Sequence, residues 1–359
     1  MIKVLDRYLL KYFITALLLV MFGIGMLIIA INMIDELQRF VDNDVPMKDI
    51  ITYYIYFAGW ILKSFLPVFV LLAALISIGI LARRNEILAM KASGISLYRI
   101  AAPFLVFTLL LSIGHIYYNE VIYAEANKKR VEMKEYTIRK RSPRHHTTTR
   151  NIYRQVNKNF FYTIASYNAS TMEGREIRLY RSFQDRLAEL ITAPRLDYTS
   201  QGWTLYDGVK RIFEDSIESF EEFDTLVVSY IKERPSDFEV PLGKPEDMAY
   251  RELEHYIDMM KRTGGPYQRE LVDLKLKLSY PLASFIVILI CVPIASNPKR
   301  GGIAISVALG TGIALLYFIA FKVTQSFGYN ERLHPDVAAW LINGIFFLTG
   351  LMITWRSRK

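Results

Sequence analysis

Residues 83–99 read RRNEILAMKASGISLYR and lie between two long apolar runs of the chain. Asn85 is suited to the N-cap of a short helix, Glu86 favours its first turn, and Gly94 is suited to end it. Three residues give such a helix an apolar side: Ile87, Leu88 and Met90. The stretch therefore predicts an amphipathic helix of about two turns, pinned at a membrane surface, that another protein can grip. Taken by itself, however, the stretch slightly favours the alternative, an interfacial loop whose arginines only fix the topology.

Composition places the chain among membrane proteins. Of its 359 residues, 52% are hydrophobic and only 22% are charged, which does not suit a soluble enzyme of two domains. The single cysteine, Cys291, lies inside an apolar run, so the sequence contains neither a disulfide framework nor a cysteine metal site.

Six runs of the sequence are predicted to span a membrane, because about 20 apolar residues cross a hydrocarbon core of ~30 Å as a helix. They are Tyr12–Ile34, Ser64–Ala82, Ile100–Asn119, Leu278–Asn297, Gly301–Phe321 and Val337–Trp355. The second span is expected to begin near Ile50, with Lys63 as its one interruption. The first run exceeds the ~7–15 residues of a signal-peptide core and lacks a cleavage site, so we expect an uncleaved span.

Residues 120–277 differ in character and carry most of the charge. Short alternating runs predict the strands of a jelly-roll-like or sandwich-like β domain: Asn159–Ser166, Glu176–Phe183, Leu187–Thr192 and Trp203–Phe213. A polar helix is predicted before them at 124–140, and an amphipathic helix after them, from Pro245 to Gly264. The expected organisation is thus three spans in 1–119, an all-β domain with flanking helices in 120–277, and three spans in 278–359.

The distribution of Lys and Arg predicts the orientation. The short flanks on one side of the predicted spans contain twelve Lys and Arg residues, whereas the other side has three, Arg39, Lys48 and Arg332. The positive-inside rule then puts both termini and the 83–99 helix in the cytoplasm and the β domain outside.

Several chemistries are missing from the sequence. It contains no phosphate-binding P-loop and no H-E-x-x-H or G-x-S-x-G motif, and His145–His146 has no carboxylate or cysteine partner at ligand spacing. No Asp or Glu lies in the middle of a predicted span, where an ion relay would place one. We therefore expect a chain that does not hydrolyse ATP by itself, and a gradient-driven transporter is less favoured.

A set of cations is predicted at the outer ends of the spans: Arg39, Lys63, Lys275, Lys277 and Lys322. Lys63 lies about 20 residues before Arg83, or ~30 Å along a helix. Snorkelling to ordinary headgroups accounts for a single such lysine. Five together, against the positive-inside tendency, favour an anionic lipid with phosphate groups held at that depth, and Phe318 is assigned to the same substrate site.

The order of these parts resembles a known family, the lipopolysaccharide-transport permeases of the inner membrane, whose paired subunits are called the F and G types. The resemblance rests on Val4–Tyr8 (VLDRY), Leu81–Gly94 (LARRNEILAMKASG), the helix from Glu252 to Gly264, Lys277, Pro281–Leu282 and Asn297–Pro298. The VLDRY start and Ala92–Gly94 are more similar to the G type.

This resemblance implies half of an ATP-binding-cassette exporter in the inner membrane of a Gram-negative bacterium. Such a permease pairs with its F-type relative and with a cytoplasmic ATPase dimer, which holds ATP and Mg²⁺, while the permease chain binds no cofactor or nucleic acid. The complex takes lipopolysaccharide from the outer leaflet and passes it through jelly-roll domains to a periplasmic bridge protein; a single-span membrane partner is also allowed.

Carried over to this sequence, the coupling helix falls on residues 84–94. Its contact residues would be Arg84, Glu86, Ile87, Met90 and Gly94, with Glu86 facing the ATPase. Substrate contacts would fall on Arg39, Lys63, Lys322 and Phe318.

Two other classes remain open at this point. A secondary transporter would need an ion-coupling site within the membrane, and a membrane-anchored receptor or scaffold would use its spans only as anchors. A copurifying P-loop ATPase would favour the exporter.

Overall fold

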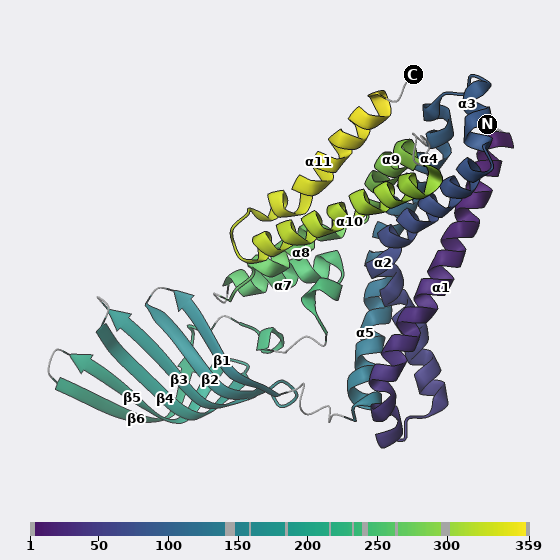
Figure 1. The fold of residues 1–359 in the computed structure, drawn as a ribbon. Helices are drawn as coiled ribbons and strands as arrows, with labels where there is room; N and C mark the ends of the chain where they lie inside the picture. The colour runs from purple at the N-terminus through teal and green to yellow at the C-terminus, as the bar shows by residue number, and fades with distance from the viewer. Residues whose placement is uncertain are drawn as a thin grey trace. The chain divides into compact units, whose positions relative to one another are not determined.

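The computed structural model describes residues 4–140, 148–157, 159–183, 186–214, 217–231, 233–238, 243–262, 265–295 and 302–356. Contacts divide the chain into two compact units (Figure 1). The helical unit comprises Met1–Met133, Glu246–Leu253 and Gln268–Lys359, and the β unit comprises Lys134–Pro245 and Glu254–Tyr267. These limits differ from the predicted boundaries at 119 and 277, because segments on both sides of the sheet pack with the helices.

The first half of the helical unit is built from long helices. Its elements are α1 (Val4–Asp42), α2 (Met47–Arg83), the short α3 (Glu86–Ala92), α4 (Leu97–Tyr117), the π-helical turn η1 (Tyr118–Tyr123) and α5 (Ala124–Glu132). A second π-helical turn, η2 (Met133–Ile138), follows α5 and lies mostly in the β unit, which begins at Lys134. The elements from α4 to η2 form one 42-residue helix. The third predicted span and the polar helix predicted after it are thus continuous, which explains why the unit extends past residue 119.

The second half adds α8 (Gln268–Ser279), α9 (Ala283–Ala295), α10 (Gly302–Tyr329) and α11 (Pro335–Arg356). α7 (Tyr250–Arg262) begins in the helical unit, and its residues from Glu254 onward belong to the β unit. α8 and α9 meet at 52°, at a break that contains Pro281. α9 is the central helix, because it contacts α2, α4, α10 and α11 and because residues 286–292 are all buried. The start of α1, α3 and the end of α11 lie at one end of the helical unit (Figure 1).

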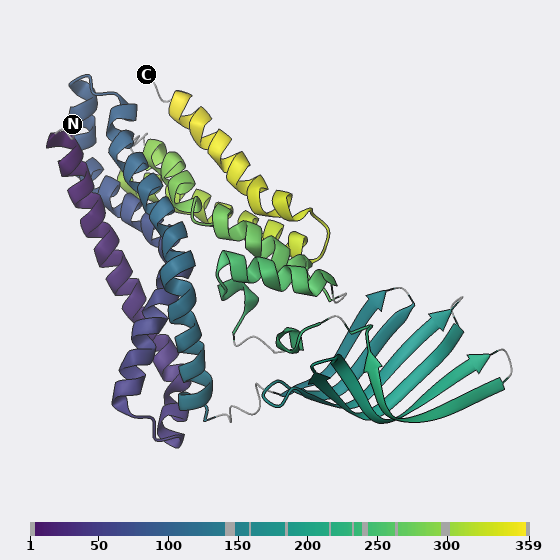
Figure 2. The same ribbon diagram turned by 180° about the vertical axis from the view of Figure 1, so that it is seen from behind.

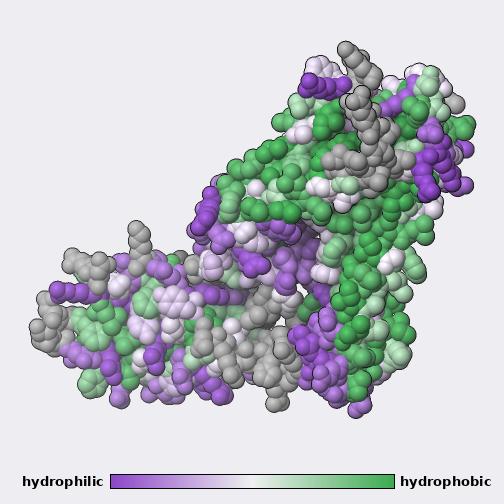
Figure 3. All heavy atoms as spheres, in the orientation of Figure 1, coloured by the Kyte–Doolittle hydropathy of each residue, from purple (hydrophilic) through white to green (hydrophobic). Residues whose placement is uncertain are grey.

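Four helices in the described part of the chain are long and apolar enough to cross a membrane, or five if the bent α8–α9 pair counts as one span. The four are α1, α2, the continuous helix Leu97–Ile138 and α11. α10 coincides with the fifth predicted span, but the predicted total of six is not confirmed. Figure 3 shows apolar residues covering much of the surface of these helices, as membrane-facing helices require.

The β unit contains a single curved sheet of six antiparallel strands (Figure 2). The strands are β1 (Thr148–Asn157), β2 (Phe160–Asn168), β3 (Glu173–Phe183), β4 (Arg186–Thr199), β5 (Gly202–Glu214) and β6 (Ile217–Val228). The four predicted strands are confirmed as β2 to β5. A jelly roll is not confirmed: each strand pairs with its neighbours in the chain, which is the order of a meander.

The core of the β unit lies on one face of this sheet. Alternate residues of the strands point into it, among them Tyr162, Ile164, Ile177, Leu179 and Leu205, all at most 1% exposed. Phe238 of the short helix η3 (Pro235–Phe238) packs on the Trp203 ring, and the Trp203 indole donates a hydrogen bond to the Glu233 carbonyl at 2.8 Å. The sheet therefore has an apolar inner face that is covered by the chain following β6.

A proline in an interior strand interrupts the sheet. Pro194 of β4 has no N–H to donate, and the neighbouring strands place Glu176 and Asp207 in the left-handed region, with φ of 53° and 55°. Next to Asp207, a Cβ on Gly208 would lie 2.3 Å from the Phe223 ring, so only glycine fits there. The irregularity leaves an open hollow of about 460 Å³ over β3, β4 and β5.

Candidate functional site

The predicted amphipathic helix is present as α3, which connects α2 to α4. It covers Glu86–Ala92, and Gly94, with φ of 80°, ends it as predicted. Asn85 occupies the N-cap in a left-handed conformation, but its side chain makes no capping hydrogen bond. The prediction is thus correct for the position of the helix and wrong for the capping role of Asn85.

The apolar side of α3 is divided between the protein interior and solvent. Ile87 is 2% exposed and Met90 is half-buried, so these two predicted contact residues attach α3 to its own chain. Leu88 is 63% exposed, and the neighbouring Arg84 side chain is 57% exposed. Leu88 was not among the predicted contact residues, although it presents the larger apolar surface.

The first turns of α1 hold α3 in place. The Tyr8 hydroxyl donates to the Glu86 carboxylate at 2.7 Å, and the Arg84 guanidinium donates to the Tyr12 hydroxyl at 2.8 Å. Tyr8 was not predicted as a site residue. Its signal in the sequence is the VLDRY start, but the contact joins residues 78 positions apart and needs the fold to be seen.

The segment after α3 is attached to α1 as well. Arg99 forms an ion pair with Asp6 at 2.5 Å, and both side chains are partly buried. The Ser96 hydroxyl accepts a hydrogen bond from the Arg99 N–H and caps α4. Together with the two tyrosine contacts, this ion pair fixes the orientation of α3 relative to α1.

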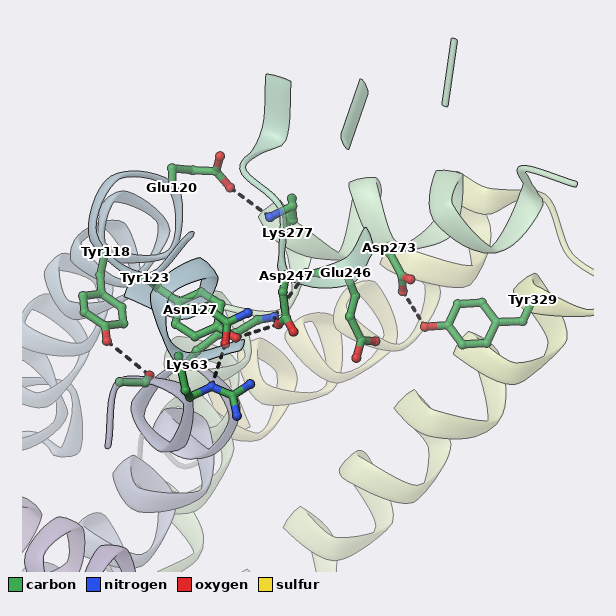
Figure 4. Close-up of polar contacts among 12 residues, drawn as sticks. Lys63, Tyr118, Glu120, Tyr123, Asn127, Glu246, Asp247, Asp273, Lys277 and Tyr329 are labelled. Atoms are coloured by element: carbon green, nitrogen blue, oxygen red, sulfur yellow. Dashed lines mark hydrogen bonds and ion pairs between the residues drawn. The ribbon is translucent and has the colours of Figure 1, made fainter. Parts of the chain in front are cut away.

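A second polar cluster lies where α2, η1 and the turn η4 (Pro245–Asp247) meet (Figure 4). The Lys63 ammonium lies 2.6 Å from a carboxylate oxygen of Asp247 and donates to the Glu246 carbonyl at 3.1 Å. The Tyr123 hydroxyl donates to the same Asp247 oxygen at 2.6 Å, and the ammonium lies 4.8 Å from the centre of the Tyr123 ring. Lys63 is therefore surrounded on several sides by groups that favour its charge.

The Asp247 carboxyl is ionised at neutral pH. Burial raises its pKa, whereas the Lys63 ammonium and the hydrogen bonds from Lys63 and Tyr123 lower it. The lowering effects together are larger, so the pKa lies below the ordinary value for an aspartate. The Asp247 side chain is 9% exposed and that of Lys63 is 22% exposed. The predicted rim cation Lys63 thus already has an internal carboxylate partner, which the sequence analysis did not foresee.

The lysines of α8 have carboxylate partners too. Lys277 lies 3.3 Å from Glu120, which also accepts a hydrogen bond from the backbone N–H of Tyr250 (Figure 4). Lys275 pairs with Asp336 at 2.9 Å. Lys63 and Lys277 lie in the same polar cluster (Figure 4).

The other predicted substrate residues make local contacts. Arg39 pairs with Glu36 of its own helix at 2.5 Å and remains 49% exposed. The exposed Lys322 donates to Gln325 at 2.8 Å. Phe318 is half-buried beside the Tyr317 ring.

No group of three or more potential metal ligands occurs among the residues that the structure describes. His145 and His146, for which the sequence shows no partner at metal-ligand spacing, lie outside those residues.

Comparison with known proteins identifies the family. The family model described as "Lipopolysaccharide export system permease LptF/LptG" matches residues 7–356. The chain belongs to this LptF/LptG family. It is 21% identical over 364 residues to the lipopolysaccharide export system permease protein LptG of Escherichia coli K12, covering 99% of this chain and 98% of that protein. It is also 22% identical over 313 residues to LptG of Haemophilus influenzae, covering 83% and 82%.

Membership of the LptF/LptG family confirms the resemblance drawn from the motifs. The chain has a role in lipopolysaccharide export as part of the Lpt system, and its LptG relatives are transport components. The family and the apolar helices make it a multi-pass protein of the inner membrane. Both curated relatives are named LptG, the type that the sequence favoured.

Proposed function

We propose that this LptF/LptG-family chain is the G-type half of an ATP-binding-cassette exporter. It would pair with an F-type permease, extract lipopolysaccharide from the outer leaflet of the inner membrane, and pass it to a periplasmic bridge. The observation that carries the proposal is the family match over residues 7–356. The sequence has no ATP-binding motif, and in this proposal the drive would come from another subunit.

In this proposal, α3 is the coupling helix that docks on a cytoplasmic ATPase dimer, where ATP and Mg²⁺ bind. The exposed Arg84 and Leu88 and the carboxylate of Glu86 supply its contact surface, while Ile87 and Gly94 give the helix its position and its end. Both termini would lie on the same, cytoplasmic side, as the Lys and Arg distribution predicts.

The substrate would bind with its phosphates at the outer ends of the spans. Arg39, Lys63 and Lys322 are the proposed phosphate partners, with Phe318 contacting the lipid. Charge-assisted hydrogen bonds to phosphate are among the strongest polar contacts, which supports cations at this depth as the selective element.

The β unit would carry the substrate onward in the periplasm. A bridge protein with β structure would pair with a free edge of the sheet, because strand addition supplies main-chain hydrogen bonds without requiring particular side chains. A single-span membrane partner is compatible with the same edge.

Glu86→Lys tests the proposed coupling. A reversed charge at a docking contact costs several kcal/mol, or at least about a hundredfold in affinity, so the variant should insert normally but no longer copurify with the ATPase in mild detergent. Because the substitution also removes the bond from Tyr8, the matched control is Tyr8→Phe, which loses that bond and keeps the carboxylate.

Tyr8→Phe should retain the ATPase and most of the transport. Full ATPase association and transport by Glu86→Lys would show that α3 is not the coupling helix. If the wild-type chain copurified with no P-loop ATPase at all, the exporter proposal itself would fail in favour of a scaffold.

A further inference from the structure

The position beside the Lys63 ammonium at which an anion would bind is occupied by a carboxylate of the same chain. A carboxylate oxygen of Asp247 lies 2.6 Å from the Lys63 ammonium, which is the contact that a phosphate oxygen would make with the same lysine. Because this carboxylate and a lipid phosphate would compete for one ammonium, they cannot both hold the position.

The two partners differ in how firmly the fold holds them. Lys63 lies in the middle of α2, a helix of 37 residues, so its backbone moves only with that helix. Asp247 lies in η4, a turn of three residues, and follows Pro245, the last residue of that part of the β unit. Asp247 can therefore withdraw by rearrangement of a short turn, whereas Lys63 stays in place.

Contacts beyond Asp247 keep this turn closed. The backbone N–H of Tyr250 donates to Glu120, and Glu252 pairs with Lys128 at 3.0 Å. Segment 246–253 is thus attached to η1 and α5 by polar contacts, and its apolar side chains Met248 and Leu253 are buried. A segment held in this way is able to open and close as a unit, because a change at one contact affects the others.

We propose that Asp247 is an internal competitor for the phosphate of the lipid substrate: it occupies Lys63 when the site is empty and withdraws, with segment 246–253, when a phosphate binds. This inference rests on the proposed function, in which Lys63 binds a lipid phosphate. The competitor keeps a partly buried ammonium paired while no substrate is present. It also lowers the apparent affinity for the lipid, because only the fraction of molecules in the open state can bind a phosphate at Lys63.

Asp247→Asn is the first test, because it removes the competing charge with almost no change in shape. The complex with its permease and ATPase partners would be placed in nanodiscs, and binding of fluorescent lipopolysaccharide measured at equilibrium. If about nine molecules of ten are in the closed state, removing that state raises the apparent affinity for lipopolysaccharide about tenfold. The matched control is Asp258→Asn, at an exposed aspartate 3.7 Å from Lys261, and should change binding less than twofold.

Two further measurements separate this inference from the proposed function. Dephosphorylated lipopolysaccharide should bind wild type and Asp247→Asn equally, because only a phosphate competes with the carboxylate. Lys63→Met should weaken binding of the phosphorylated lipid and abolish the gain from Asp247→Asn. If Lys63→Met has no effect, the proposed role of Lys63 fails; if it weakens binding but Asp247→Asn does not strengthen it, only the competitor is overturned.

A measurement on the wild-type chain guards against a folding defect in the variant. Hydrogen exchange of segment 246–253 should accelerate several-fold when lipopolysaccharide is added, because the Tyr250 N–H loses its contact with Glu120 as the turn opens. Unchanged or slower exchange in this segment under saturating lipid would overturn the proposal whatever the variant does.

Discussion

At the scale of single residues, the proposed functional charges are already paired inside the chain. Glu86 accepts a hydrogen bond from Tyr8, Lys63 pairs with Asp247, and Arg39 pairs with Glu36. Removing one partner of such a pair leaves the other partly desolvated, so a single charge reversal changes both the pair and the surface. Variants that neutralise a charge without changing its shape are therefore more informative here.

A buried asparagine provides a residue-scale prediction about stability. Asn343 of α11 accepts a hydrogen bond from the Tyr317 hydroxyl at 2.5 Å and donates to the Ser279 carbonyl at 2.8 Å, and so joins α10 and α8 to α11. Asn343→Leu leaves both partners unpaired among apolar groups, and we expect a loss of about 1–2 kcal/mol of unfolding free energy. Thermal unfolding in detergent measures it.

Thr349→Val is the control on the same helix. Thr349 is exposed, and its hydroxyl donates only to the Ile345 carbonyl one turn earlier, at 2.7 Å. Its replacement should change the unfolding temperature far less than Asn343→Leu does. Equal shifts for the two variants would mean that Asn343 does not hold the helices together.

At the scale of elements, the sequence patterns predicted those helices and strands that depend on interactions between residues close together in the chain. α3 and the strands β2 to β5 follow from helix-ending glycine, alternation and turn residues, and all are present. β1 and β6 were not among the predicted strands. In β6, four acidic residues obscure the alternation: Glu218, Glu221, Glu222 and Asp224. The partner of Lys63 could not be predicted, because Asp247 lies 184 positions away and only packing brings them together.

The edges of the sheet give an element-scale prediction. Residues 160–168 form β2, which pairs with both β1 and β3, so the main-chain groups of this strand are already used. β6 pairs only with β5 within the described residues and remains an edge. Photocrosslinkers at Leu226 and Tyr230 should therefore capture a periplasmic β protein, whereas one at Thr163 should not.

The same crosslinkers decide between the two edges of the sheet. Strong capture from position 163 with none from 226 or 230 would mean that β6 is not the docking edge. A photocrosslinker at Tyr153 of β1 samples the opposite edge and shows whether the partner uses that strand instead.

At the scale of the whole molecule, the distribution of Lys and Arg predicts how the protein is oriented across the membrane, which the helices alone do not determine. The lone cysteine allows a clean test, since Cys291 is 1% exposed and should not react with a membrane-impermeant maleimide. Met172→Cys, in the exposed turn between β2 and β3, should be labelled in intact spheroplasts. Leu88→Cys on α3 should be labelled only after the membrane is permeabilised. The reverse pattern would invert the predicted topology.

The strand order of the sheet has a consequence for how the protein is made. Every strand pairs with a segment that has just been synthesised or is about to be, so no strand waits for a distant partner, and the chain-closure cost of each pairing is small. In the proposed orientation, the sheet can therefore assemble strand by strand as it leaves the translocon, and its core is completed when Phe238 arrives. By the time the ribosome reaches α8 to α11, the exported unit would already be folded, and it could not slide back through the membrane while the remaining helices insert.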